Sequence, residues 1–150
     1  MLTDCTGSCA PGYVAGFNVP RAQCMLGIAN ATYYVGKDLN IAFAALAISS
    51  TQFQVISDAS LDTQGVVIAH PKANAITVSF RGTLLTASNL ELDIDISWDS
   101  YQATITSNKS STTSGWQVAN GFAQAYLSLR SQMQKSLAWA LTQVGTSPTV

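Results

Sequence analysis

The residues with the clearest chemical potential are Arg81-Gly82-Thr83, which directly follow an alternating apolar run, Ala75 to Phe80. A glycine lets the backbone approach a ligand closely, and Thr83 offers a backbone N–H and a hydroxyl as hydrogen-bond donors. In open α/β sheets, ligands bind at the carboxyl ends of the strands. Two interpretations of Gly82-Thr83 stay open: a plain turn, or donors that stabilise the oxyanion of an acyl-transfer reaction.

Other candidate groups are weaker. His70, the single histidine, falls in a predicted turn, away from the carboxyl end of the strand, so we do not expect a general base there. Asp93, Asp95 and Asp99 are spaced like a calcium loop, but Trp98 occupies the position where that loop needs a glycine. Cys5, Cys9 and Cys24 have no second ligand pair nearby, and we expect no metal site.

A nucleophile is not evident in these residues. The segment from Gly145 to Thr149 imitates a Gly-x-Ser-x-Gly elbow but lacks the final glycine, and its Pro148 would obstruct the strand-to-helix turn. We therefore expect no nucleophile in this chain.

The elements that must position Gly82 and Thr83 follow from apolar periodicity. Gly65 to Ala69 is continuously apolar, which is typical of a strand buried on both faces. With Ala75 to Phe80, which we expect to be a central strand, it predicts a β-hairpin around His70-Pro71-Lys72-Ala73-Asn74. Further predicted elements are helices over Pro20–Gly36, over Leu39–Ser49 after an Asp38 cap, and over Gly121–Val144, a strand at Phe53–Ile56, an alternating strand over Asp93–Tyr101 and a surface loop over Lys109–Gly115.

The predicted helices should bury particular stripes. The first has Met25, Ile28, Ala29 and Tyr33 on one side, and the second is apolar nearly all round. The long helix carries a stripe of residues spaced three and four apart: Phe122, Ala125, Tyr126, Leu129, Met133, Leu137, Ala140, Leu141 and Val144. Helices alternating with strands indicate the α/β class.

Phe80-Arg81-Gly82-Thr83 resembles the signature of class 3 lipases, the fungal triacylglycerol lipase and feruloyl esterase type of α/β-hydrolase. Asn89 and Asp93 match the segment after that signature, and Gly121-Phe122 with Tyr126 matches the helix before the nucleophile strand. The resemblance implies that residues 1–150 are the N-terminal portion of an α/β-hydrolase fold, with residues 1–19 as an extended arm, truncated before the nucleophile elbow.

The resemblance also implies roles. Thr83 would contribute to the oxyanion hole and Gly82 to its loop. Leu84 to Leu92 would form a lid that uses Leu84, Leu85, Asn89, Leu90 and Leu92. A packed connecting helix over the same residues stays open as the alternative. The parent enzyme would hydrolyse acylglycerols or other carboxylic esters at a lipid interface, without a cofactor, in lipid degradation. This chain alone would be inactive. The alternative is a non-catalytic pseudoenzyme or a secreted module that binds lipid or a partner.

Composition favours a secreted protein of one domain. Hydrophobic residues make up 47% and charged residues 10%, with a net charge of −1 that offers no surface for nucleic acid. Asn30 and Asn108 begin glycosylation sequons. One disulfide among the three cysteines would fit an oxidising compartment, although buried small residues with a free thiol fit as well. No signal peptide is visible, and an exposed sheet edge predicts self-association.

Overall fold

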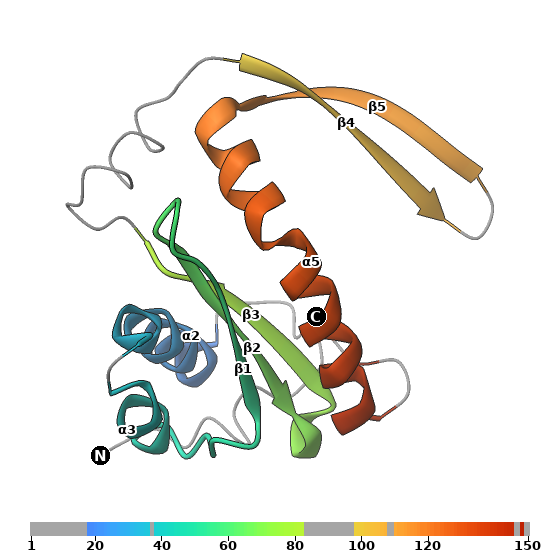
Figure 1. Ribbon diagram of the computed structural model, residues 1–150. Helices are drawn as coiled ribbons and strands as arrows, with labels where there is room; N and C mark the ends of the chain where they lie inside the picture. The colour runs from blue at the N-terminus through green and yellow to red at the C-terminus, as the bar shows by residue number, and fades with distance from the viewer. Residues whose placement is uncertain (1–17, 37, 83–97, 108–109, 146–147, 149–150) are drawn as a thin grey trace.

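The computed structural model describes residues 18–36, 38–82, 98–107, 110–145 and 148, with the backbone alone for 98–107 and 110–120. Strands β1 (Phe53–Asp58), β2 (Thr63–His70) and β3 (Ala75–Phe80) form an antiparallel sheet in the order β1-β2-β3. Helices α2 (Val19–Ala31) and α3 (Leu39–Ala44) lie on one face, and α5 (Asn120–Gln143) crosses the other (Figure 1). The described part is thus a mixed helix-and-sheet fold, as the general α/β class predicts.

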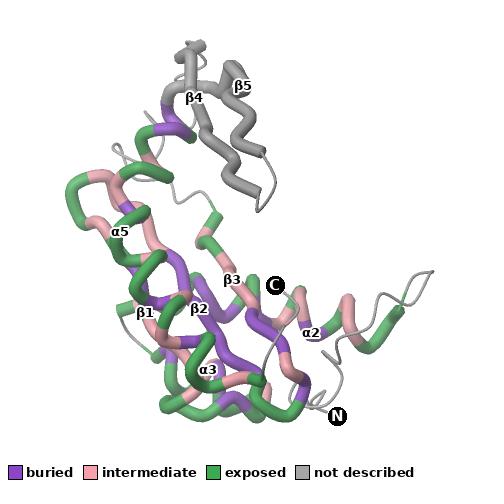
Figure 2. Tube along the Cα trace, turned by 90° about the vertical axis from the view of Figure 1, so that its right-hand side faces the viewer, coloured by how far each residue is buried: buried purple, intermediate pink, exposed green. Residues whose placement is uncertain are grey.

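The central strand, β2, is buried on both faces, as its continuous apolar run predicts. Val66 and Ile68 pack with Ile28 and Phe43 of the helices α2 and α3. The intervening Val67 and Ala69 pack with Ile76 of β3 and Ala140 of α5, because successive side chains of a strand point to opposite faces. Figure 2 shows this concentration of buried residues along β2. The core therefore consists of two apolar layers, one on each face of the sheet, and β2 contributes to both.

The predicted β2–β3 hairpin is confirmed. His70 pairs with Ala75 and Gly65 with Phe80, and the 3-10 turn η2 (Pro71–Ala73) joins the strands through Asn74 in the left-handed conformation. β3 is an outer strand of the described sheet, although we expected it to be central; β2 takes that place.

The first helix begins and ends near the predicted residues. The side chain of Asn18 accepts a hydrogen bond from the N–H of Arg21, and a short 3-10 helix, η1 (Thr32–Tyr34), leads to Gly36 at φ 85°. The predicted stripe is wrong in part. Ile28 is buried, but the inward side chains beside it are Cys24 and Ala31, while Ala29 and Tyr33 face solvent.

The second helix is shorter than predicted, and it is not buried all round. Ile41 is 71% exposed, whereas Phe43 is fully buried. The chain leaves α3 through a Schellman motif: the N–H of Ile48 bonds the carbonyl of Phe43, and the N–H of Ala47 bonds that of Ala44. Ala47 takes the left-handed conformation, with φ 60°, where a glycine is usual. Asp38 makes no side-chain cap bond.

Strand β4 (Trp98–Ser107) pairs with β5 (Ser110–Ala119) in a separate two-stranded sheet that leads into α5. The loop predicted over Lys109–Gly115 is therefore wrong from Ser110 onwards. Its threonines suit a strand because they are branched at Cβ, even though the segment has few apolar residues. Of the alternating segment Asp93–Tyr101, residues 98–101 are strand and 93–97 lie outside the described residues.

The long helix α5 matches its predicted bounds within about one residue. Leu129 and Ala140 are buried as expected, and Ser136 joins them on the inward face. Phe122 and Leu141, which we also placed in the stripe, are 64% and 51% exposed. The inward face is thus narrower than the predicted stripe and built of smaller side chains.

Candidate functional site

The candidate site lies where β3 ends, at Arg81 and Gly82. Thr83, Leu84, Leu85, Asn89, Leu90 and Leu92, the remaining predicted oxyanion-hole and lid residues, lie outside the described residues. Gly82 is exposed and is the second residue after β3, which ends at Phe80. A Cβ built on Gly82 would overlap the hydroxyl of Tyr33 in η1. Glycine at this position therefore allows Tyr33 of η1 to lie directly against the backbone of Gly82.

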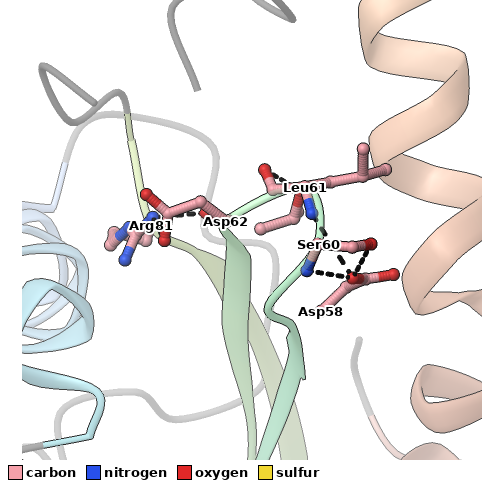
Figure 3. Close-up of polar contacts among 6 residues, drawn as sticks. Asp58, Ser60, Leu61, Asp62 and Arg81 are labelled. Atoms are coloured by element: carbon pink, nitrogen blue, oxygen red, sulfur yellow. Dashed lines mark hydrogen bonds and ion pairs between the residues drawn. The ribbon is translucent and has the colours of Figure 1, made fainter. Parts of the chain in front are cut away.

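Arg81 is turned back into the protein, although it stands at the edge of the sheet. Its Nη2 lies 2.9 Å from Oδ1 of Asp62 and also donates to the Asp62 carbonyl (Figure 3). The side chain of Arg81 is only 4% exposed, and that of Asp62 is 23% exposed. The N–H of Arg81 donates to the carbonyl of Gln64 at 2.8 Å, which extends the hairpin ladder by one pair.

The turn that carries Asp62 is itself tightly bonded. Oδ1 of Asp58 accepts hydrogen bonds from the Ser60 hydroxyl at 2.5 Å and the Ser60 N–H at 2.8 Å. These bonds from Ser60 hold the pKa of the Asp58 carboxyl below its usual value. Asp62 has φ 50°, a left-handed conformation that aspartate tolerates better than most residues.

Helix α5 is bonded to the same turn. The side-chain amide of Gln132 donates to the carbonyl of Ser57 at 2.8 Å and accepts from its N–H at 3.1 Å. The hydroxyl of Ser128, one turn earlier, instead donates to the carbonyl of Ala125 within α5 at 2.9 Å. The β1–β2 turn thus connects α5 with the residues that end β3.

On the other face, a hydroxyl pair joins β3 to α2. Thr32 donates its hydroxyl to the carbonyl of Ile28 at 2.8 Å. Its oxygen lies 2.9 Å from that of Ser79, so Ser79 is the donor in this second bond. β3 is therefore hydrogen-bonded to the α2–η1 layer two residues before Arg81.

His70 lies at the opposite end of the hairpin from Gly82, since it pairs with Ala75. The residue is 1% exposed, and its Nε2 lies 3.1 Å from the hydroxyl of Thr77. Nδ1 is buried with no hydrogen-bond partner among the described residues. Burial lowers the pKa of the imidazole, so the neutral form is favoured in this packing role.

Sequence reasoning missed Asp62, Tyr33 and Gln132. One signal for Asp62 was present: extending the hairpin register places Arg81 opposite Gln64, with an acidic residue two positions further on. The other two contacts depend on how η1 and α5 pack on the sheet, for which the sequence carries no local pattern.

The described residues contain no cluster of three His, Cys, Asp or Glu side chains that could hold a metal ion. Among their helices, none is long and apolar enough to cross a membrane. No protein-family model matches the chain, and no curated protein matches it.

Proposed function

We propose that these residues belong to a carboxylic ester hydrolase of the class 3 lipase type, in which they supply the oxyanion loop rather than the nucleophile. The observation that carries the proposal is the fixed backbone at Arg81-Gly82, directly before Thr83, at the carboxyl end of a strand. Oxyanion stabilisation requires donors that are already in place when charge develops.

The course of α5 supports the α/β-hydrolase architecture. Gln132, at its middle, bonds Ser57 near one end of the sheet, while Gly145, beyond its last turn, approaches Asn74 at the start of β3. The helix therefore runs antiparallel to β3. A strand following α5 would begin beside the start of β3 and run parallel to it, as in a right-handed crossover. Its carboxyl end would then lie near Gly82, where a nucleophile belongs in this family.

Secretion is part of the same proposal. Cys24 is disulfide-bonded, and structural disulfides are typical of oxidising compartments. Asn30, the first residue of a glycosylation sequon, is exposed. Both features suit an extracellular enzyme that acts on acylglycerols or similar esters.

A fluorophosphonate probe, which labels activated serines, tests the proposal directly. We expect no labelling and no hydrolysis of p-nitrophenyl butyrate by the 150-residue chain. The product of the complete reading frame should be labelled and should hydrolyse the ester. Absence of both reactions in that product would overturn the proposal.

A second candidate function, a non-catalytic module that binds lipid, is favoured by the exposed apolar side chains. Leu26, Ile41 and Phe122 are 72%, 71% and 64% exposed. Flotation of the chain with phosphatidylcholine vesicles, in a full-length product that no fluorophosphonate labels, would select this function over the first.

A further inference from the structure

The ion pair between Arg81 and Asp62 lies between the end of β3 and the turn before β2. Arg81 makes three contacts there: Nη2 with the carboxylate and with the carbonyl of Asp62, and its N–H with the carbonyl of Gln64. These contacts restrain both the side chain and the backbone of Arg81. Gly82, the next residue, is consequently restrained on its amino-terminal side.

Burying an arginine head group is costly, and an ion pair in such a place seldom adds much stability over apolar packing. In some proteins such a pair instead selects one fixed geometry. The surrounding contacts agree with that role. Asp62 follows a turn that the bonds between Asp58 and Ser60 hold together (Figure 3). The side chain of Gln132 bonds Ser57 beside this turn and so links it to α5.

The side of Gly82 that faces η1 is restrained as well. The hydroxyl of Tyr33 lies where a side chain at this position would begin. Gly82 therefore lies between an aromatic side chain on one side and the anchored Arg81 on the other. Such a backbone is held in place before any ligand arrives.

We propose that Arg81 and Asp62 are positioning residues for the oxyanion loop, and that the β1–β2 turn transmits the position of α5 to Gly82. The proposal rests on the proposed hydrolase function. The pair does not touch the substrate in this role; it sets the direction in which the backbone leaves β3.

Hydrogen exchange followed by mass spectrometry tests the positioning in the 150-residue chain itself. Asp62→Asn removes the charge but keeps a residue that tolerates φ near 50°. We expect amides at Arg81 and Gly82 to exchange about tenfold faster, as the loss of a charge-assisted hydrogen bond predicts. Asp38→Asn, the same chemical change at an exposed residue without a cap bond, should leave them unchanged.

Amides of the central strand β2 provide the internal reference, because they report global unfolding. If they accelerate as much as those of Arg81 and Gly82, the pair stabilises the whole fold and the positioning role is wrong. Unchanged exchange at Arg81 and Gly82 would overturn it equally.

The product of the complete reading frame gives the second readout. Asp62→Asn should lower kcat by up to about 10²-fold, the cost of a small misplacement in an active site, with little change in KM. Arg81→Lys, which keeps the charge, should retain most of the wild-type kcat. Arg81→Met should lose about as much as Asp62→Asn. An unchanged kcat beside accelerated exchange would contradict the catalytic relevance of the pair. No hydrolysis by the wild type would overturn the proposed function instead, while exchange still decides the positioning.

Discussion

β1 and β3 are the two outer strands of the same described sheet, but their backbones have different surroundings. The pairing with β2 turns the N–H and carbonyl groups of Phe53, Val55 and Ser57 outward on β1. Those of Ser57 are both bonded by the side chain of Gln132. On β3, Ile76, Val78 and Phe80 turn theirs outward, and no hydrogen bond from another described residue reaches them.

The difference indicates which edge of the sheet has free backbone groups for pairing with a further strand. An outer strand without charges, prolines or a covering side chain tends to pair with another strand. β3 contains neither a charged residue nor a proline, and its carboxyl end carries the candidate site. Within the described residues, the β1 edge is covered at Ser57, whereas the outward groups of the β3 edge have no such cover. This asymmetry agrees with the proposal that a further strand pairs with β3.

The bonds that cover the β1 edge depend on how α5 packs on the sheet. Leu129→Ala is expected to disturb this packing most. Leu129 is 1% exposed and lies about one helical turn before Gln132, whose side chain bonds Ser57. Its loss should lower the free energy of unfolding by about 2–5 kcal/mol. Urea denaturation measures the change. Leu127→Ala, at a neighbouring residue that is 49% exposed, is the control and should cost far less.

Self-association should depend on the edge formed by β3 and not on the edge formed by β1. Phe80→Lys places a charge beside the outward backbone of β3, and we expect it to weaken dimerisation or aggregation by about tenfold or more. Val55→Lys makes a matched change on β1, since the two residues are 48% and 42% exposed. Static light scattering across a concentration series compares them. Equal effects of both substitutions, or a wild type that remains monomeric, would contradict the asymmetry.

Removing the amide that covers β1 should make the two edges more alike. Gln132→Ala loses two hydrogen bonds of an exposed side chain, so the free energy of unfolding should fall by only about 1 kcal/mol. Association should rise, because Ser57 then presents free backbone groups. Phe80→Lys in this background should no longer abolish association. If it does, Gln132 does not protect the β1 edge.

Acid should weaken the β2–β3 hairpin next to its turn, where His70 pairs with Ala75. Burial lowers the pKa of His70, so the unfolded chain binds a proton more readily than the folded one. The stabilisation from neutral His70 is full above about pH 6.5, the ordinary value of the imidazole. It is lost as the pH falls below that value towards the lower folded pKa. Denaturation of wild type and His70→Gln between pH 7.5 and 5 isolates the effect; parallel curves would exclude it.

Much of this sheet was predictable because its signals are local. The apolar run at Gly65 to Ala69, the turn residues around Pro71 and the long periodicity of α5 each specify an element without reference to the rest. The errors arose where a local signal was missing. Ala47 ends α3 in a conformation that normally shows as glycine, and the threonines of β5 form a strand with little apolar character.

The candidate site was predictable only in its location. The sequence places Arg81-Gly82 at a strand end, and the structure agrees. Only the hairpin register pointed to Asp62 as the partner of Arg81. The Tyr33 contact and the link through Gln132 depend on how η1 and α5 pack on the sheet, so no local pattern could predict them. Thr83 and the predicted lid residues lie outside the described residues, and their roles stay predictions.

The central claim, that the loop beginning at Gly82 stabilises an oxyanion, is tested most directly by Thr83→Val in the product of the complete reading frame. Valine keeps the shape and the backbone N–H but removes the hydroxyl. We expect kcat to fall by about 10²-fold, near the lower end for one lost donor. KM should stay nearly constant, and Thr83→Ser should retain most activity. A kcat within about twofold of wild type, together with a lower melting temperature, would instead make Thr83 a turn residue.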